Sequence, residues 1–173
     1  MRIPFICATF VFALLSFLPA HASDKVFFTD IRGEWSGPGE IVAGKYKGTK
    51  FVCTFGGTEP ETAKGMSVDG ACRVGVFSRP MNAEIIKTAG RYIGSFLDGE
   101  KGQGMDITGG RYTKNRLVVE IKRNKLNGIM VANLSDRNRL KVTISVRHNN
   151  KLVPVIGMNL ARKSDPIVTG STN

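Results

Sequence analysis

Arg139-Leu-Lys-Val-Thr-Ile-Ser-Val-Arg147 decides the fold, because its side chains alternate between apolar and polar without a break. Successive side chains of a β-strand point to opposite faces, so this alternation predicts a strand with one buried face and a basic outer face. The apolar face consists of Leu140, Val142, Ile144 and Val146, and the polar face of Arg139, Lys141, Thr143, Ser145 and Arg147.

Three similar runs surround this strand within residues 110–162. They cover residues 116–122, 126–134 and 152–162, and short polar turns separate them. Upstream, turn signals recur every 8 to 14 residues, which predicts about nine or ten short strands in all. No stretch has a convincing long helical period. The sequence therefore predicts an all-β fold, either a single antiparallel β-barrel of about eight to ten strands or a β-sandwich.

Glycine and proline interrupt the pattern in the N-terminal half. We expect a short leader over residues 23–29 and a turn or a kinked strand over residues 30–39, which contain three glycines and a proline. Residues 66–77 fit either a strand or a hairpin that breaks at the turn pair Asp69-Gly70, and we expect a turn at Gly109-Gly110.

Residues 80–89 fit two structures. Ser78 could cap a helix that Gly90 ends, and Pro80 suits a first helical turn. Met81, Ala83 and Ile85 alternate with polar residues, however, and this alternation favours a strand.

The first 22 residues are typical of a secretory signal peptide. Arg2 gives a positive start, an apolar run follows from Phe5 to Leu18, and Ala20-His21-Ala22 has the small residues that a signal peptidase requires. A membrane anchor is the alternative, but about 14 apolar residues fall short of the ~20 that span a bilayer. We expect cleavage after Ala22, a periplasmic or secreted protein without a transmembrane segment, a β-barrel domain over residues 23–163 and a flexible tail over residues 164–173.

Two cysteines remain after this cleavage, because Cys7 leaves with the signal peptide. Cys53 and Cys72 lie 19 positions apart, and two cysteines in an exported domain most often form a disulfide. Metal ligation is an alternative that needs further ligands, and His148 is the one histidine beyond residue 22. Free thiols are the other alternative. We expect one disulfide and no metal.

Gly33-Glu34-Trp35 and Arg162 together resemble a pattern of the lipocalin (calycin) superfamily. In that superfamily a Gly-x-Trp opens the first barrel strand, and a late arginine packs across the tryptophan to close the base of the barrel. The resemblance covers four residues and implies a calycin-like barrel in which Trp35 and Arg162 are candidate cavity residues; it implies no particular ligand. The chain departs from the pattern in its many glycines after Trp35 and in lacking a clear helix before the final strands.

The sequence offers no strong catalytic arrangement. His148 could serve a Ser–His pair, but it lies in the turn Arg147-His-Asn-Asn-Lys151, where a solvated histidine is far more common. The glycine motifs of hydrolase elbows, phosphate loops and dinucleotide sites do not occur. Asp69, Asp98 and Asp106 could supply a carboxylate pair, but each lies beside glycine or in a turn. We expect no enzymatic activity, no catalytic residues and no cofactor.

Positive charge is concentrated between residues 111 and 151. This segment contains 11 lysines and arginines and two acids, a net charge of +9, against +11 for the whole chain. Such a field attracts polyanions and weakens with salt. In an exported protein an anionic lipid or glycan is a more plausible polyanion than nucleic acid, because Tyr112 is the one aromatic residue of the segment. The candidate anion-binding residues are Arg116, Lys122, Arg139, Lys141 and Arg147.

These observations lead to three hypotheses about function. The first is a non-enzymatic binding module of the cell envelope that contacts anionic lipid or glycan through the basic face. The second is a lipocalin-like carrier of a small apolar ligand in the barrel interior. The third is a secreted protease inhibitor, because small bacterial metalloprotease inhibitors have a similar barrel, a signal peptide and one disulfide. Their N-terminal segment enters the protease cleft, and Ser23-Asp24-Lys25 is short for that role.

Overall fold

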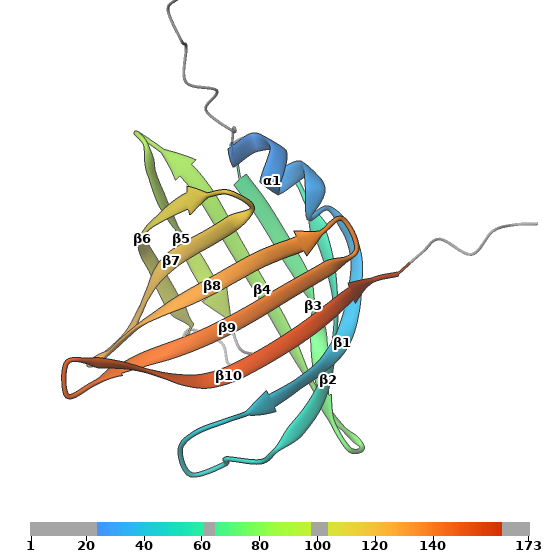
Figure 1. Ribbon diagram of the computed structural model, residues 1–173, viewed down its shortest axis with the longest axis vertical. Helices are drawn as coiled ribbons and strands as arrows, with labels where there is room; N and C mark the ends of the chain where they lie inside the picture. Colours follow the sequence, from blue (N-terminus) through green and yellow to red (C-terminus); the bar gives the residue numbers. More distant parts are fainter. Residues whose placement is uncertain (1–23, 61–64, 98–103, 164–173) are drawn as a thin grey trace, which may run out of the picture.

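The computed structural model describes residues 24–60, 65–97 and 104–163, which form a closed barrel of ten antiparallel strands (Figure 1). Each strand pairs with its neighbours in sequence, and β1 pairs with β10 to close the barrel. The prediction of an all-β antiparallel barrel is confirmed. The elements are α1 (Asp24–Asp30), β1 (Gly33–Ile41), β2 (Lys50–Thr58), β3 (Gly65–Val74), β4 (Phe77–Thr88), β5 (Arg91–Leu97), β6 (Met105–Thr113), β7 (Arg116–Arg123), β8 (Leu126–Asp136), β9 (Arg139–His148) and β10 (Lys151–Arg162).

The runs that predicted the fold form β7 to β10. In β9, Val142 and Ile144 are buried in the core while Arg139 and Lys141 are exposed, as the alternation predicts. The same two-residue period buries alternate positions of β7. These inward side chains pack across the barrel as one apolar core. The inward residues of β7 are Leu117, Val119 and Ile121.

β1 is a continuous strand, so of the two structures expected over residues 30–39 the turn is wrong. A Cβ atom added to Gly37 would lie 2.0 Å from the carbonyl oxygen of Asn159 in β10. Glycine is therefore needed here because the two backbones approach closely, and it does not mark a chain reversal.

The two expected turn pairs also lie inside strands. Asp69-Gly70 is within β3, where a Cβ atom on Gly70 would lie 2.0 Å from the carbonyl oxygen of Thr54. Gly109-Gly110 is within β6, beside an irregularity in its pairing with β7. The chain instead reverses after β3 at Gly75, which has a φ of 58°, and after β6 at Lys114 and Asn115, which also have positive φ.

Residues 80–88 belong to β4, which confirms the preference for a strand over a helix. β4 pairs with β3 along ten residues and with β5 along seven. The alternation of Met81, Ala83 and Ile85 therefore outweighed the helix-like signals at Ser78 and Gly90. Pairing with both neighbouring strands satisfies the backbone N–H and C=O groups of this segment. A helix here would leave β3 and β5 without a strand to pair with on that side.

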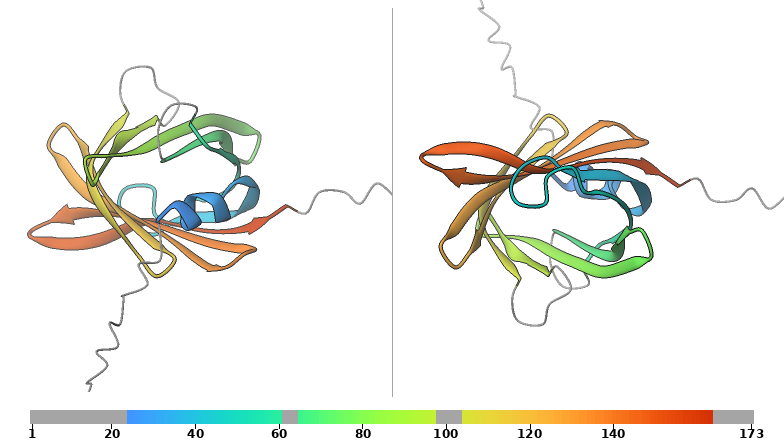
Figure 2. Two further views of the ribbon diagram at one scale, coloured as in Figure 1. Left: turned by 90° about the horizontal axis from the view of Figure 1, so that it is seen from above. Right: turned by 90° about the horizontal axis from the view of Figure 1, so that it is seen from below.

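α1 replaces the irregular leader that the sequence predicts over residues 23–29, and it lies over the mouth at one end of the barrel (Figure 2). Phe27 packs against Tyr112 and Phe28 against Tyr92, with ring centroids 5.2 Å and 6.0 Å apart. A helix of seven residues has little stability of its own, so these contacts hold it in place. We call this the helix end of the barrel and the opposite one the far end. Of the connections that the structure describes, the far end carries β1–β2, β3–β4, β7–β8 and β9–β10.

Cys53 and Cys72 face each other in the β2–β3 ladder and form a disulfide, as predicted. Their sulfur atoms are 1.93 Å apart and their Cα atoms 4.0 Å apart. Cys53 is fully buried, and its sulfur lies 3.8 Å from that of Met158 across the core. The predicted signal peptide and C-terminal tail lie outside the described residues. Within those residues we find no helix with the length and apolarity to cross a membrane.

Candidate functional site

Trp35 lies at the helix end of β1, where a hydrogen bond and a cation–π contact hold its indole ring in place. The ring is 2% exposed, and its Nε1–H donates a hydrogen bond of 2.9 Å to the carbonyl oxygen of Ile31. This bond satisfies a buried polar group that would otherwise destabilise the core. On its other side the guanidinium of Arg162 lies 4.3 Å from the ring centroid, a cation–π contact.

Arg162 binds three backbone carbonyls from two segments at the helix end. Its Nε donates to the carbonyl oxygen of Arg137 at 2.9 Å, and its terminal nitrogens donate to the carbonyl oxygens of Arg32 and Asp30. These carbonyls belong to the β8–β9 turn and to the link between α1 and β1. The planar guanidinium can serve all of them while it stacks on Trp35. Arg162 therefore closes the base of the barrel, and Trp35 is the candidate cavity residue that lines the interior space.

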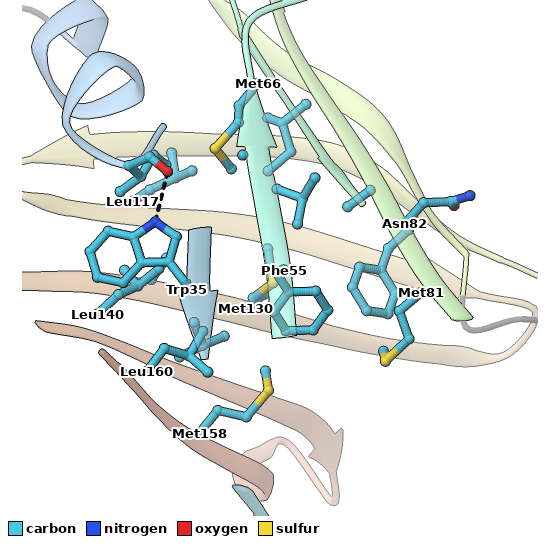
Figure 3. Close-up of a pocket in the computed structure, with 18 residues that line it drawn as sticks. Trp35, Phe55, Met66, Met81, Asn82, Leu117, Met130, Leu140, Met158 and Leu160 are labelled. Atoms are coloured by element: carbon cyan, nitrogen blue, oxygen red, sulfur yellow. Dashed lines mark hydrogen bonds between the residues drawn. The ribbon is translucent and has the colours of Figure 1, made fainter. Parts of the chain in front are cut away.

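The interior of the barrel contains a cavity of about 90 Å³ beside Trp35 (Figure 3). Its lining comes from β1 to β5, from β7 to β10 and from Ile31, and it is apolar apart from Asn82. An engineered cavity of about 150 Å³ takes up benzene, so this one has room for a molecule of a few heavy atoms. Asn82 lies on β4 between the inward-facing Met81 and Ala83, and its exposed amide points away from the cavity (Figure 3).

Methionine side chains make up much of the cavity wall (Figure 3). Methionine is unbranched and has three rotatable bonds, so it adapts to ligands of different shape. Rotation of these side chains would enlarge the cavity without moving a strand. The residues are Met66, Met81, Met130 and Met158, one each from β3, β4, β8 and β10.

The five candidate anion-binding residues are exposed but do not form one patch. Arg116 and Arg139 lie at the helix end, since β7 and β9 start there. Lys122 and Arg147 lie near the far end, and Lys141 lies between the ends on β9. The basic face of residues 111–151 is therefore spread along the length of the barrel.

Arg139 is bound within the turn that precedes it. Its Nε lies 2.5 Å from Oδ2 of Asp136, and the backbone N–H of Asn138 donates to Oδ1 of the same carboxylate at 2.9 Å. The Asn138 hydrogen bond, followed by that from Arg139, lowers the pKa of Asp136 below its usual range. Among the five candidates, Arg139 is thus engaged in holding the β8–β9 turn.

The candidate catalytic residues that the structure describes lie on separate strands. No group of three or more His, Cys, Asp or Glu side chains within residues 24–60, 65–97 and 104–163 could hold a metal ion. His148 is exposed at the end of β9. Asp69 and Asp106 are exposed on β3 and β6, and Asp98 lies outside the described residues.

Sequence reasoning missed bases on two N-terminal connections at the far end. Lys45, Lys47 and Lys50 lie on the β1–β2 connection, and Arg73 and Arg79 flank the β3–β4 turn. All five are exposed. Their proximity to the β7–β8 and β9–β10 connections could be found from sequence by counting chain reversals, because alternate reversals of an up-and-down barrel meet at the same end.

Comparison with known proteins supports the fold and goes no further. No family model matches the chain, and no curated protein sequence matches it. Among solved structures, the chain is similar to the crystal structure of Rv2717c from M. tuberculosis, with a TM-score of 0.55 and 10% sequence identity. The match covers 79% of this chain and 94% of that one. At this identity the similarity shows a shared barrel architecture and carries no function.

Proposed function

We propose that this protein is a non-enzymatic binding protein that holds a small apolar molecule inside its barrel. The observation that carries this proposal is the cavity of about 90 Å³ beside Trp35, with its apolar, methionine-rich wall. Apolar surface that is transferred from water into such a space gives favourable binding free energy. The barrel is otherwise filled by packed side chains, so the ligand would be compact or would displace methionines.

Trp35 makes the proposal testable without a label, because it is the one tryptophan of the chain and it lines the cavity. Chloroform is a suitable probe, since it is weakly polar, has only a few heavy atoms and quenches tryptophan fluorescence through its chlorine atoms. We expect saturable quenching of Trp35 at probe concentrations that leave free tryptophan unaffected. Quenching that rises linearly to the solubility limit would contradict an internal site.

A pair of matched substitutions locates the binding. Ala83→Leu would place a larger side chain into the cavity, and Ala161→Leu makes the same change on the exposed face of β10. Saturable quenching should disappear in Ala83→Leu and persist in Ala161→Leu. Circular dichroism of both variants checks that the barrel is intact.

A second candidate function is contact with an anionic lipid or glycan of the cell envelope through the bases of residues 111–151. The exposure of Arg116, Lys122, Lys141 and Arg147 supports it. Retention on an anionic glycan or lipid resin at about 0.5 M salt would favour a specific contact, because simple electrostatic attraction is strongly screened there. Elution at physiological salt would indicate that the protein is retained only by non-specific electrostatic attraction.

Export and calycin relationship belong to the same proposal. The apolar N-terminal run and the Cys53–Cys72 disulfide support export to an oxidising compartment. The stacking of Arg162 on Trp35 is the packing that the lipocalin resemblance implies, although this barrel has ten strands and lipocalin barrels have eight. For a protease inhibitor we find no supporting contact, since α1 begins at Asp24 and packs against the barrel.

A further inference from the structure

Exposed apolar side chains gather at the far end of the barrel. Ten large apolar residues are strongly exposed in the described part of the chain, and seven of them lie on the four far-end connections. Val76 and Phe77, in and beside the β3–β4 turn, are 89% and 76% exposed. The seven residues are Val42 and Tyr46 (β1–β2), Val74, Val76 and Phe77 (β3–β4), Leu126 (β7–β8) and Leu152 (β9–β10).

The same four connections carry basic residues and no carboxylate, whereas the sequence between β5 and β6, outside the described residues, includes Asp98 and Glu100. We define the docking rim as residues 42–50, 73–79, 122–126 and 147–152. It contains ten bases and no aspartate or glutamate. Each of its four segments combines at least two bases with at least one exposed apolar residue, as in Lys45-Tyr46-Lys47 and Lys151-Leu152. The ten bases are Lys45, Lys47, Lys50, Arg73, Arg79, Lys122, Arg123, Lys125, Arg147 and Lys151.

A groove of about 660 Å³ lies between two segments of the docking rim. Lys50 and Arg73 contribute to its wall, together with the hydroxyls of Thr54 and Ser78. Val52, which is exposed, pairs with Arg73 across the β2–β3 ladder. Two cations and two hydroxyls beside an apolar side chain suit the phosphate and glycerol of a lipid headgroup.

We propose that the docking rim binds the surface of a bilayer that contains anionic phospholipid, with the apolar tips inserted among the headgroups and the bases against the phosphates. Apolar insertion and attraction to anionic lipid reinforce each other at such a surface. The inference rests on the second proposed function and specifies its surface and its partner. The barrel axis would point towards the membrane, with α1 and the closed helix end away from it (Figure 1).

Charge and side-chain type favour a lipid surface over other partners. Ten bases on one rim repel a second copy of the same rim, which argues against self-association through this end. Five of the seven apolar residues are valine or leucine, which do not stack on nucleic acid bases. Four separate tips that surround one barrel mouth suit an extended surface.

Vesicle sedimentation tests the proposal. The purified protein is mixed at 0.15 M salt with sucrose-loaded vesicles of equal phosphatidylglycerol and phosphatidylcholine, or of phosphatidylcholine alone. We expect sedimentation with the anionic vesicles and little with the neutral ones. Val76→Ser combined with Phe77→Ser should weaken the partition by about tenfold or more, because both side chains lose apolar burial. Lys125→Glu combined with Lys151→Glu should weaken it to a similar degree.

Matched changes at the helix end are the controls. Val26→Ser removes an exposed valine from α1, and Arg91→Glu combined with Lys163→Glu reverses two exposed bases at the helix end that lie outside residues 111–151. We expect changes below about threefold, because these positions lie away from the bilayer and salt screens them. All the substituted side chains are exposed, and thermal unfolding checks that each variant is folded.

Other outcomes separate failure of the inference from failure of the function on which it rests. Arg111→Glu combined with Arg116→Glu tests the wider basic face of residues 111–151. A loss in that variant equal to the loss in the Lys125/Lys151 variant, with no loss in the Val76/Phe77 variant, would overturn docking through the rim and leave general contact by residues 111–151. Binding to an anionic glycan resin but not to vesicles would overturn the lipid partner alone. Absence of binding to both would overturn the inference and the second proposed function together.

Discussion

The two ends of this barrel differ: the helix end is covered by packed side chains, and the far end exposes apolar and basic side chains. At the helix end, Phe27 and Phe28 cover the mouth, and Arg162 binds three backbone carbonyls beside Trp35. At the far end, valine, leucine, tyrosine and phenylalanine side chains stay exposed among bases. Since the strands are continuous between the ends, the difference lies in the connections. It teaches that closure and stability are concentrated at one end, which leaves the other end free to carry a surface that folding does not require.

Three ion pairs lie at the helix end, and the disulfide lies towards the far end. Arg32 pairs with Glu59, Arg139 with Asp136 and Lys163 with Glu34, and all three pairs lie at the helix end. The disulfide lies towards the far end, three positions after the start of β2 and two before the end of β3. A covalent bond thus supports the end that lacks a helix.

Removal of the indole of Trp35 should give the largest effect. Trp35→Ala should lower the free energy of unfolding by about 3–5 kcal/mol, since a buried aromatic ring, its hydrogen bond and its contact with Arg162 are lost. Urea unfolding measures this. Tyr46→Ala is the control at the far end, where the ring is 63% exposed, and it should change stability by less than about 0.5 kcal/mol. Similar losses in the two variants would break the distinction between the ends.

Loss of the disulfide should come second. Replacement of Cys53 and Cys72 by serine, or reduction, should lower stability by about 3 kcal/mol, because the unfolded chain is no longer constrained across this loop. Urea unfolding with and without reductant measures the difference. Hydrogen exchange should show faster exchange in β2 and β3 near the far end than at Trp35. A uniform increase around the barrel would contradict local support of the far end.

A change of Arg162 to lysine should have a smaller effect than these two. The positive charge remains, but one ammonium cannot serve the carbonyls of Asp30, Arg32 and Arg137 while it stacks on Trp35. We expect a loss of about 2 kcal/mol, together with a shift in Trp35 fluorescence. Arg147→Lys at the far end is the control and should be near neutral. An unchanged Arg162→Lys variant would show that charge alone suffices at the base of the barrel.

Asp136→Ala should give the smallest effect, and pH should reveal it. The pKa of Asp136 is lowered in the folded state, so its carboxylate stabilises the fold above the ordinary aspartate pKa of about 3.9. That contribution is lost as the pH falls through the lowered pKa. The variant should therefore melt slightly below the wild type at pH 7 and together with it at strongly acidic pH. A difference that persists in acid would assign the effect to the shape of the turn.

The alternating strands could be predicted from sequence because their signal is local. The period of β9 requires only that Val142 and Ile144 face inward and that Lys141 face outward. The disulfide was predictable from cysteine number. The helix was not, because α1 has seven residues and is stabilised by Tyr92 and Tyr112, which are distant in sequence.

Glycine limited the rest of the prediction. The same residue serves a reversal, as at Gly75, and a close approach of strands, as at Gly70, and local sequence does not distinguish the two. Turns misplaced at Asp69-Gly70 and Gly109-Gly110 change the number of reversals, and hence the end of the barrel at which each base lies. The sequence therefore shows that the chain is rich in basic residues, but it does not show at which end of the barrel each of them lies.

The bond between Cys53 and Cys72 has one more consequence, for chain integrity. Hydrolysis of any peptide bond between residues 54 and 71 would leave the two fragments covalently joined and still paired within one molecule. A clipped molecule of this kind would migrate as one band on a gel without reductant and as two bands with it. Secreted peptidases could thus nick the backbone there without separating the N-terminal strands from the remainder.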